Sequence, residues 1–498
     1  MKKINKFLSK STFIRGCQCV KSLWLHKYKP ELRDEISDAQ EAIFQRGTDV
    51  GRLARNLFPS GYDASPDDYS KFFQSIGKTR IAIENDEKII YEAAFTSNGL
   101  SAAIDILVKK NGKWFGYEVK SSTSVSETYL LDAAFQYFVI KSSSIDLQNI
   151  FIVYLNTEYI RHNTLDLKKL FNAQSVKKEV LSKQSFVKKS IENMHRTLCM
   201  PTMPEINIGL HCSNPYPCDF QGYCWRKIPE NSIFELTRFP QKKMFDLFNQ
   251  GVVSLKKFPA SVKLSKNQII QIDGIKKNKS NIDIPALKIF LTTLSYPLYF
   301  FDFETFMPAV PLYKNSRPYQ QIPFQYSLHY KKSDKSILQH RAFLGDGQSD
   351  PREALIRQFI KDTGKEGDII VYNQSFEKTR LAELARDFPK YKKQLNNRIK
   401  RIKDLLVPFQ QKLYYTPSMN GSASIKSVLP ALVPSLSYKN LDIGNGGDAM
   451  AAYQNMVYET NKKIIDETRN ALLKYCHLDT LAMVKILEKL MKITRHQI

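Results

Sequence analysis

The amino-acid sequence predicts an α/β protein with two domains joined by a helical linker. Its 498 residues are too many for one hydrophobic core, and a hydrophobic content of 43% is enough to fill two. Two stretches alternate strands with helices, and a polar, lysine-rich helical segment separates them. We therefore predict a first domain over residues 1–229, a linker over 230–294 and a second domain over 295–498.

The first domain has three strand-like segments between helix-rich ends. These segments read IIYEAAF, LSAAIDILVK and KWFGYEVK, and Asn111-Gly112 predicts a tight turn between the last two. The linker carries no cluster of catalytic residue types, so we interpret it as a structural spacer. A helical hairpin that touches a nucleic-acid backbone is the alternative.

The second domain begins with a strand of buried character, YPLYFFDFET. The segments PFQYSLHY and DIIVYN continue the strands, and SFEKTRLAELARDF is typical of a helix. A final helix is expected from about Asp466 to Ile493. This order of elements predicts a second α/β domain.

Charge favours a polyanionic partner. Lys and Arg outnumber Asp and Glu by 74 to 49, a net charge of +25. Because neutralising phosphates releases counterions, nucleic acid is the first expected partner; a generally lysine-rich proteome is the alternative explanation. We find no signal peptide and no apolar run of about 18 residues, so we expect a cytoplasmic protein without membrane contact.

Two carboxylates and a lysine are expected to meet on neighbouring strands of the first domain. Because side chains alternate along a strand, Glu118 and Lys120 share one face while Val119 points into the core. Asp105 lies on the preceding strand. Carboxylates bind Mg²⁺ or Mn²⁺, and an ammonium group orients water and offsets phosphate charge. The pattern indicates phosphodiester cleavage; an amphipathic hairpin with a solvated charged face is the alternative.

The cysteines indicate a metal centre. Seven cysteines in a cytoplasmic protein do not suggest a disulfide framework, and Cys212, Cys218 and Cys224 follow one another at intervals of six. A four-ligand site needs one more soft donor, which Cys17 or Cys19 can supply. His211 is a further alternative, and thiolate ligands alone do not separate an iron-sulfur cluster from zinc.

A second group of acidic residues is spread over the second domain. Asp302 and Glu304 share one face of the first strand, and Glu377 follows the strand DIIVYN near the start of a helix. Tyr475 and Asp479 lie four residues apart on one face of the last helix. Their order and placement predict a site for two metal ions; a chance pair on a strand and a solvated helix edge are the alternative.

GLSAAIDIL, YEVKSS and LDAAFQYFVI resemble the RecB-like branch of the PD-(D/E)xK nucleases, CRISPR-associated adaptation nucleases included. The resemblance implies a restriction-endonuclease-like core and a supporting role for Gln136. The family's R-G-x-x-x-H histidine corresponds to Gly51, and its tyrosine after the glutamine corresponds to Ile140. One metal ligand must then come from elsewhere, and Glu92 is a candidate.

CVKSLWL resembles the early cysteine helix of iron-sulfur RecB-like nucleases. The resemblance implies that Cys19 joins Cys212, Cys218 and Cys224 in holding a 4Fe-4S cluster, which connects the two ends of the domain. Zn²⁺ bound by the same thiolates is the alternative.

DFE, NQSFE and YCHLD resemble the motifs of the DEDD exonucleases, a DnaQ-like group with an RNase H-like fold. The resemblance implies that four carboxylates hold two divalent ions, that Tyr475 orients the attacking water, and that nucleotides are removed from a 3′ end. Glu377 stands where the family has aspartate. His477 is a bystander in this interpretation, and Asp404 is a peripheral acid.

The whole chain resembles an uncharacterised prokaryotic family that joins a RecB-like nuclease domain to an RNase H-like domain. GSASIKSVLPALVPSLSYKNLDIGNGGDAMAAY is similar to a signature stretch of that family. Lys426 in this stretch is then a candidate phosphate contact, and the glycines let backbone approach a strand closely. A purely structural loop is the alternative.

We therefore expect a metal-dependent nuclease that acts on nucleic acid, with DNA favoured over RNA. The alternative is a binding protein in which one or both nuclease folds have lost activity. A third hypothesis is a cysteine cluster that senses redox state and gates binding. Salt-sensitive binding without metal-dependent cleavage would favour the binding protein.

Overall fold

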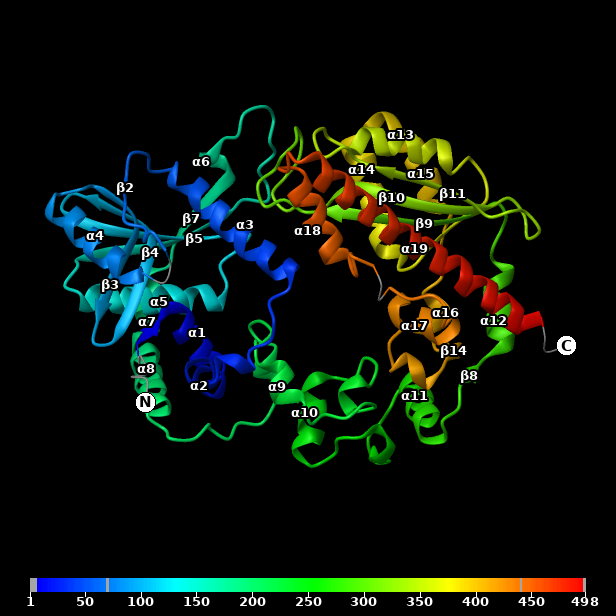
Figure 1. The fold of residues 1–498 in the computed structure, drawn as a ribbon, viewed down its shortest axis with the longest axis horizontal. Coiled ribbons are helices and arrows are strands. Elements are labelled where there is room, and N and C mark those ends of the chain that lie inside the picture. Colours follow the sequence, from blue (N-terminus) through cyan, green and yellow to red (C-terminus); the bar gives the residue numbers. More distant parts are fainter. Residues whose placement is uncertain (1–6, 69–70, 439–440, 496–498) are drawn as a thin grey trace. The chain divides into compact units, whose positions relative to one another are not determined.

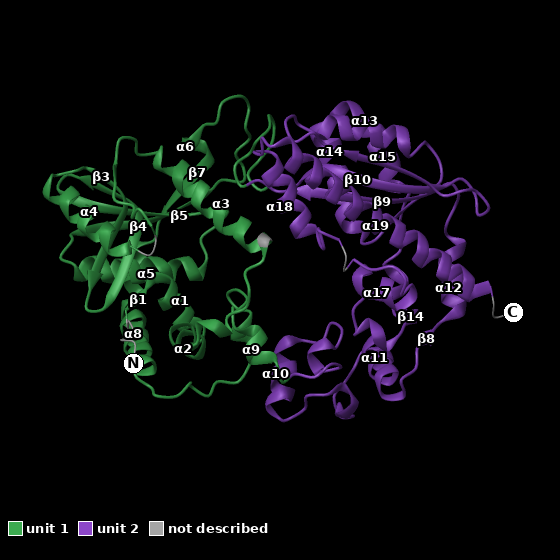
Figure 2. Ribbon diagram, in the orientation of Figure 1, with its two compact units in different colours: residues 1–227, 309–320 green, residues 228–308, 321–498 purple. Residues whose placement is uncertain are grey.

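The computed structural model describes residues 7–68, 71–438 and 441–495 (Figure 1). Two residues of the signature stretch, Lys439 and Asn440, lie outside these ranges. The chain divides into two compact units (Figure 2): unit 1 is 1–227 with 309–320, and unit 2 is 228–308 with 321–498. The expected α/β class is confirmed, because each unit combines helices with a β-sheet. Within the described ranges, no helix has the length and apolar character needed to cross a membrane.

Unit 1 is built on a seven-stranded mixed sheet. Its main path runs β2-β3-β4-β5-β6-β7, and β1 pairs with β4. β3, β4 and β5 are antiparallel, with a turn at Asn111-Gly112 in which both residues have positive φ, whereas β5 and β6 are parallel. The strands are β1 (Leu8–Ser9), β2 (Tyr62–Asp63), β3 (Ile89–Ser97), β4 (Leu100–Lys110), β5 (Lys113–Lys120), β6 (Leu147–Leu155) and β7 (Phe171–Ser175).

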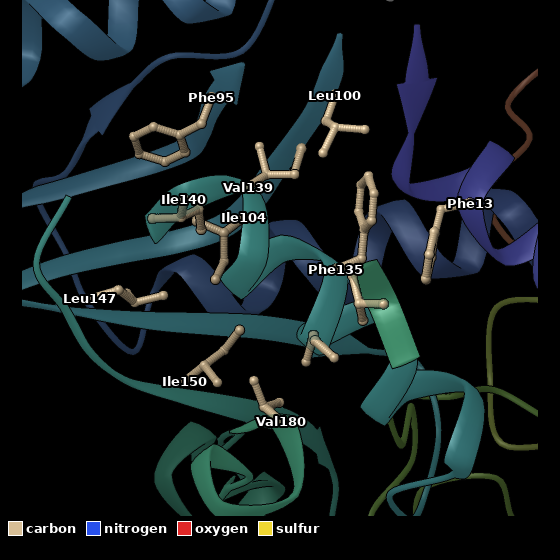
Figure 3. Close-up of a cluster of buried hydrophobic side chains, with 14 of the residues drawn as sticks. Phe13, Phe95, Leu100, Ile104, Phe135, Val139, Ile140, Leu147, Ile150 and Val180 are labelled. Atoms are coloured by element: carbon tan, nitrogen blue, oxygen red, sulfur yellow. The ribbon is translucent and has the colours of Figure 1, made fainter. Parts of the chain in front are cut away.

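Helices cover both faces of this sheet. α5 packs on one face, where its Phe135 belongs to the same apolar cluster as Ile104 and Ile150 of the strands (Figure 3). α3 covers the other face, where Val50 meets Ile106. The helices are α1 (Lys10–Gln18), α2 (Val20–Tyr28), α3 (Asp38–Arg55), α4 (Phe72–Glu84), α5 (Glu127–Ser142), α6 (Leu167–Leu170), α7 (Lys177–Ser182), α8 (Gln184–Leu198) and α9 (Gln221–Trp225).

Unit 2 has a five-stranded sheet in the order β11-β10-β9-β12-β13. β9 is antiparallel to β10 and parallel to β12. A separate short pair joins β8 to β14. The strands are β8 (Asn281–Ile282), β9 (Leu298–Phe306), β10 (Ile322–Lys331), β11 (Gln339–Leu344), β12 (Asp368–Val371), β13 (Ile402–Asp404) and β14 (Tyr414–Tyr415).

Side chains of β9 alternate between two apolar clusters. Phe300 joins the cluster beneath α19, and Phe301 joins the cluster beneath α13. The segment 230–294 is helical, groups with unit 2 and holds its own apolar cluster, which includes Leu236 and Ile272. The helices are α10 (Gln241–Asn249), α11 (Lys266–Lys277), α12 (Ile284–Thr292), α13 (Arg352–Asp362), α14 (Gln374–Asp387), α15 (Lys392–Lys400), α16 (Val407–Gln410), α17 (Ile425–Leu432), α18 (Gly446–Met456) and α19 (Lys462–Arg495).

Candidate metal centres

The acidic group of unit 2 begins on β9. Asp302 and Glu304 continue the face of β9 that carries Leu298 and Phe300, and α19 packs on this strand. The two-residue period of a strand predicts this shared face. Glu304 is buried and Asp302 is partly buried. The strand therefore brings both carboxylates beneath α19.

α19 adds Tyr475 and Asp479, which lie one turn apart and are both buried. Tyr475 hydrogen-bonds to the Asp479 carboxylate. Tyr438 of the signature stretch, which had not been predicted as a site residue, donates its hydroxyl to Asp479 Oδ1 at 2.6 Å. Cys476 is fully buried, and its sulfur lies 3.9 Å from Asp302 Oδ2. Two phenols therefore fix the carboxylate of Asp479, and a thiol lies beside Asp302.

α14 supplies Glu377, which lies in its first turn and is buried. The Glu377 charge, after those of Asp479 and Glu304, contributes to the raised pKa of Asp302, so the four carboxylates share one environment. We call these four residues the β9 site.

Asp404 caps the helix that carries Glu377. It lies at the end of β13 and accepts the backbone N–H groups of Asn373 and Gln374 at 2.9 and 3.0 Å. These N–H groups begin α14, and Asn373 precedes the helix with a φ of 86°. The first N–H groups of a helix have no partner inside the helix, so a carboxylate stabilises them. Asp404 therefore caps α14, and its charge, after burial, acts to raise the pKa of Glu377, so its role as a peripheral acid stays a prediction.

Burial disfavours ionisation throughout the β9 site. Burial, followed by the charges of Asp479 and Glu304, raises the pKa of Asp302 well above its usual range. Burial also raises the pKa of Glu304 to about 8, that of Glu377 to about 8 and that of Asp479 to about 6. A bound divalent cation would favour the charged forms and reverse these shifts.

The donor set of the β9 site fits such a cation. Glu377 Oε2 is buried and has no hydrogen-bond partner, and burying a carboxylate oxygen in this way is costly. Ligand atoms of Asp302, Glu304 and Cys476 lie within 4.8 Å of one another. Carboxylate oxygens in this number suit Mg²⁺ or Mn²⁺.

Lys426 on α17 borders the β9 site. Its ammonium group donates to the carbonyl oxygen of Gly444 at 2.6 Å and lies 5.6 Å from the centre of the Tyr438 ring. Its charge acts to lower the pKa of Glu304. A Cβ atom at Gly446 would lie 3.6 Å from Glu304 Oε2. Lys426 and the GNGGDAM loop therefore lie next to the carboxylates, and a phosphate contact by Lys426 stays a prediction.

The acidic group of unit 1 centres on Glu118, whose side chain is only 1% exposed. Lys120 donates to Glu118 Oε1 at 2.9 Å, which places both on one face of β5. Gln136 on α5 is fully buried and donates to Glu118 Oε2 at 2.5 Å. Lys120 also donates to Asp132 at 2.6 Å. We call Asp105, Glu118, Lys120 and Gln136 the β5 site.

A second lysine reaches Glu118 from far away in the sequence. Lys10 on α1 donates to Glu118 Oε1 at 2.6 Å. Burial alone would raise the pKa of Glu118, but the charges of Lys10 and Lys120 lower it to about 2. Since 108 residues separate Lys10 from Glu118, no local pattern could have indicated this contact.

Asp105 faces a cavity of about 500 Å³, whose lining includes residues of α3, β3, β4 and β5. Its Oδ2 accepts the N–H of Val119 at 2.6 Å. Burial, followed by the charges of Glu118 and Glu92, raises its pKa well above the usual range. Asp105 therefore has the position expected for a metal ligand beside Glu118.

Glu92 and Gly51 border the same cavity. Glu92 lies opposite Asp105 on β3, has a φ of 52° and pairs with Arg55 at 3.0 Å. A Cβ atom at Gly51 would meet nothing within 4 Å. Position 51 therefore borders the same cavity as Asp105 and Glu92.

The four cysteines that the sequence singled out line one small cavity of about 20 Å³. They are Cys19, Cys212, Cys218 and Cys224. Cys17 packs instead against the apolar cluster of unit 1, where burial raises the pKa of its thiol to about 12. Burial, followed by the charges of the neighbouring cysteines, raises the pKa of Cys19 and Cys224, although backbone hydrogen bonds at Cys19 and the charge of Lys21 at Cys224 act to lower it. A metal or cluster would displace these thiol protons.

Polar contacts hold the N-terminal helices against the cysteine segment. Gln18 donates to the carbonyl oxygens of His211 and Tyr216, both at 2.8 Å, and Arg15 pairs with Asp219 at 2.7 Å. His211 also borders the cavity, so it stays an alternative ligand. These contacts join residues about 200 positions apart at the cysteine cavity.

Comparisons with known proteins identify relatives without a described activity. Residues 299–424 match a family described as a domain of unknown function (DUF2779). The uncharacterised protein MG366 of Mycoplasma genitalium is 28% identical over 205 residues, 38% of this chain and 31% of that protein. The uncharacterised protein UU173 of Ureaplasma parvum is 31% identical over 194 residues, which are 34% of this chain and 27% of that protein. The chain therefore spans less than a third of the length of these relatives.

Proposed function

We propose that the chain is a metal-dependent nuclease that removes nucleotides from a 3′ end at the β9 site, acting on DNA rather than RNA. The observation that carries this proposal is the convergence of four largely buried carboxylates with raised pKa values, one with an unpartnered oxygen. Burying such carboxylates without a cation costs free energy, whereas a hydrolase that binds two metal ions uses them as ligands. A net charge of +25 suits a polyanionic substrate.

The sheet of unit 2 supports an RNase H-like fold for this site. Three of its strands are antiparallel, two run parallel to β9, and the first carboxylates lie on β9 itself. The DEDD motifs place their aspartate and glutamate on the first strand and the last aspartate on the final helix, as Asp302, Glu304 and Asp479 lie here.

The protein's own groups have distinct roles in this mechanism. The four carboxylates would hold Mg²⁺ or Mn²⁺, which when bound supplies a nucleophilic water and stabilises charge on the leaving oxygen. Burial raises the pKa of Tyr475 far above neutral, so its phenol keeps its proton. Its hydroxyl, tied to Asp479, orients the water. Lys426 has donors beyond the one used at Gly444, and it binds a phosphate oxygen.

For unit 1 we propose a RecB-like nuclease fold with cleavage at the β5 site. Asp105 and Glu118 would hold the metal ion, and Glu92 would supply the ligand that Gly51 lacks. Lys120 orients the attacking water. The mixed sheet with a carboxylate on each of three adjacent strands supports this assignment.

One observation favours a second candidate for unit 1, which is nucleic-acid binding without cleavage. Lys10 and Lys120 already neutralise Glu118, and Arg55 already pairs with Glu92. A site balanced in this way keeps its structure without a cation.

We propose that the cysteine cavity holds a 4Fe-4S cluster, with Zn²⁺ as the alternative. Four thiols from the two ends of unit 1 line one cavity. The N–H of Gly209 reaches Cys212 Sγ at 3.5 Å, the kind of contact that tunes cluster sulfurs.

The nuclease proposal is tested on the anaerobically purified full chain with 5′-labelled single-stranded DNA and RNA, in Mg²⁺ and then Mn²⁺. Asp302→Asn should slow the shortening from the 3′ end by about 10²–10⁴-fold, because a lost metal ligand removes several kcal/mol of transition-state stabilisation. Asp273→Asn is the matched control, since Asp273 forms only an exposed pair with Lys277 at 3.4 Å.

Lys120→Ala separates the two sites in the same assay. Cleavage that survives in Asp302→Asn but is lost in Lys120→Ala would move the activity to the β5 site. Salt-sensitive binding by every variant with no cleavage in either metal would reject the nuclease and favour the binding protein.

A further inference from the structure

Three histidines that the nuclease mechanism does not use converge in unit 2. The chain has eight histidines, and one ring nitrogen of each of His329, His340 and His477 lies within 4.8 Å of the others. The ring centres are 4.4 to 4.6 Å apart. His329 and His340 are direct partners across β10 and β11, and His477 lies on α19. Three separate elements therefore present imidazoles to one point.

The strand beneath α19 is polar at this point. Tyr326 and Leu328 face the apolar cluster under α13, whereas the alternate residues Ser327 and His329 contact Thr480 of α19. Buried polar side chains at a helix–sheet contact are unusual, and they call for a specific reason.

Each strand histidine has one ring nitrogen engaged and one left over. His329 Nδ1 lies 2.8 Å from the hydroxyl of Thr480, and His340 Nε2 lies 2.9 Å from the hydroxyl of Ser327. These two hydroxyls lie 2.7 Å from each other and both are buried. Histidines that bind a metal usually hold their second nitrogen in such a bond, which fixes the ring. The other ring nitrogens, His329 Nε2 and His340 Nδ1, take no part in these two contacts.

We propose that His329, His340 and His477 form a binding site for a divalent transition metal, with Zn²⁺ as the first choice. Three imidazoles with one open position are an established zinc ligand set. Tetrahedral zinc with bonds of about 2.0–2.1 Å places its nitrogen ligands roughly 3.4 Å apart, so small side-chain rotations close the site. His340 is exposed at the surface, which gives the ion a route of entry and a water as fourth ligand.

The protonation state suits this role. Burial, followed by the neighbouring histidine charges, lowers the pKa of His329 to about 3, and burial lowers that of His340 to about 4. Neutral imidazole is the form that binds metal. The nearby cation Lys485 also acts on His329, and Glu488 partly offsets its charge by pairing with it at 2.9 Å.

The histidine site and the β9 site use different residues of α19, and they are neighbours, because Ser327 is the cross-strand partner of Asp302. His477 and Asp479 are two positions apart, about 200° around the helix, so they point to different sides. A metal bound by the three histidines would hold α19 against β10 and β11, the same helix that carries Asp479 and Tyr475.

The test measures zinc directly on the full chain, without nucleic acid. Wild type, His340→Ala, His477→Ala and the control His162→Ala are loaded with Zn²⁺, dialysed and analysed for zinc per chain. His162 is exposed in unit 1 and lies outside the trio. His340→Ala and His477→Ala should each bind one equivalent less than wild type and the control, while metal at the cysteine cavity and the β9 site stays equal in all four.

A second measurement covers the case in which a variant folds poorly. Ser327→Ala keeps all three imidazoles and removes one hydroxyl, and it should weaken zinc binding by about tenfold. Zinc should raise the unfolding midpoint of wild type and of His162→Ala more than that of His340→Ala. Equal zinc content in all variants, with no loss of affinity in Ser327→Ala, would overturn the proposal. Either result stands whether or not the chain cleaves nucleic acid.

Discussion

The β5 and β9 sites both gather buried carboxylates, but they balance the negative charge differently. At the β5 site, Lys10 and Lys120 lower the pKa of Glu118 to about 2 although burial opposes them. At the β9 site, burial raises the pKa of Glu304 and Glu377 to about 8, and Lys426 offsets only part of this shift at Glu304. The lysines of the chain therefore balance Glu118, whereas Asp105 of the β5 site and the carboxylates of the β9 site keep raised pKa values. The pKa of Glu118 differs from those of Glu304 and Glu377 because the fold places two lysines against Glu118, not because the acidic motifs differ.

The largest expected effect comes from neutralising one glutamate in each site, which tests how each site balances its negative charge. Glu118→Gln should lower the free energy of unfolding by about 3 kcal/mol, because it leaves buried lysine charge without its partner. We take the lower end of the usual range since the Lys10 side chain is 30% exposed. Chemical denaturation of the full chain measures this loss.

Glu127→Gln is the control for Glu118→Gln. Glu127 also pairs with a lysine, Lys183, but its side chain is 68% exposed, so the change should stay within about 0.5 kcal/mol. Equal effects of Glu118→Gln and Glu127→Gln would show that the β5 site is not balanced by its lysines.

At the β9 site a Glu→Gln substitution should stabilise the metal-free protein instead of destabilising it. Glu304 and Glu377 have a pKa of about 8 in the folded protein and about 4.3 in an unfolded chain. The metal-free folded protein therefore binds protons that the unfolded chain releases, so its stability falls as the pH rises from about 5 to 8. Glu377→Gln removes one of these groups and should raise the unfolding midpoint at pH 8 by about 2–4 °C.

Thermal unfolding in EDTA across this pH range tests the expectation for the metal-free protein. The same measurement is then repeated with excess Mg²⁺. Mg²⁺ should stabilise wild type at pH 8 more than Glu377→Gln, because the variant has lost a ligand oxygen. A wild-type midpoint that does not change between pH 5.5 and 8 in EDTA would contradict the idea of an unbalanced site.

The smallest expected effect comes from adding a metal ligand to the β5 site. Gly51→His places an imidazole in the cavity that Asp105 and Glu92 border. The variant should bind Mn²⁺ about tenfold more tightly at the β5 site and should gain about 0.4 kcal/mol of helix stability over glycine. Calorimetric titration in the Asp302→Asn background isolates the β5 site.

Gly77→His is the matched control for this change. Gly77 also lies within a helix, α4, and a Cβ atom there would meet nothing within 4 Å. It should reproduce the gain in helix stability without the tighter Mn²⁺ binding. If both variants bind Mn²⁺ as wild type does, the β5 site lacks room or geometry for a further ligand.

Local patterns in the sequence account for much of both sites. Alternation along a strand predicts that Glu118 and Lys120 share a face and that Asp302 and Glu304 do so too, and helix periodicity places Tyr475 beside Asp479. These relations span at most four residues, so they depend on backbone geometry alone. The α/β class follows from the same periodicities.

The remaining contacts depend on tertiary structure. Lys10 reaches Glu118 and Tyr438 reaches Asp479 across 108 and 41 residues. Lys10 lies in no motif, and the signature stretch that contains Tyr438 does not indicate this contact. Asp404 has a sequence signal in hindsight, because a helix that starts at Gln374 needs an acceptor for its first N–H groups. The three histidines lie on three elements, and only the pairing of β10 with β11 and the packing of α19 bring them together.

The cysteine cavity joins segments of unit 1 that are synthesised at different times. Cys19 leaves the ribosome about 200 residues before Cys224, a delay of roughly 10–40 s at about 5–20 residues per second. During this interval α1 and α2 lack the segment that Gln18 and Arg15 bind. The contacts of Gln18 and Arg15 with the cysteine segment therefore form only after that segment has been synthesised.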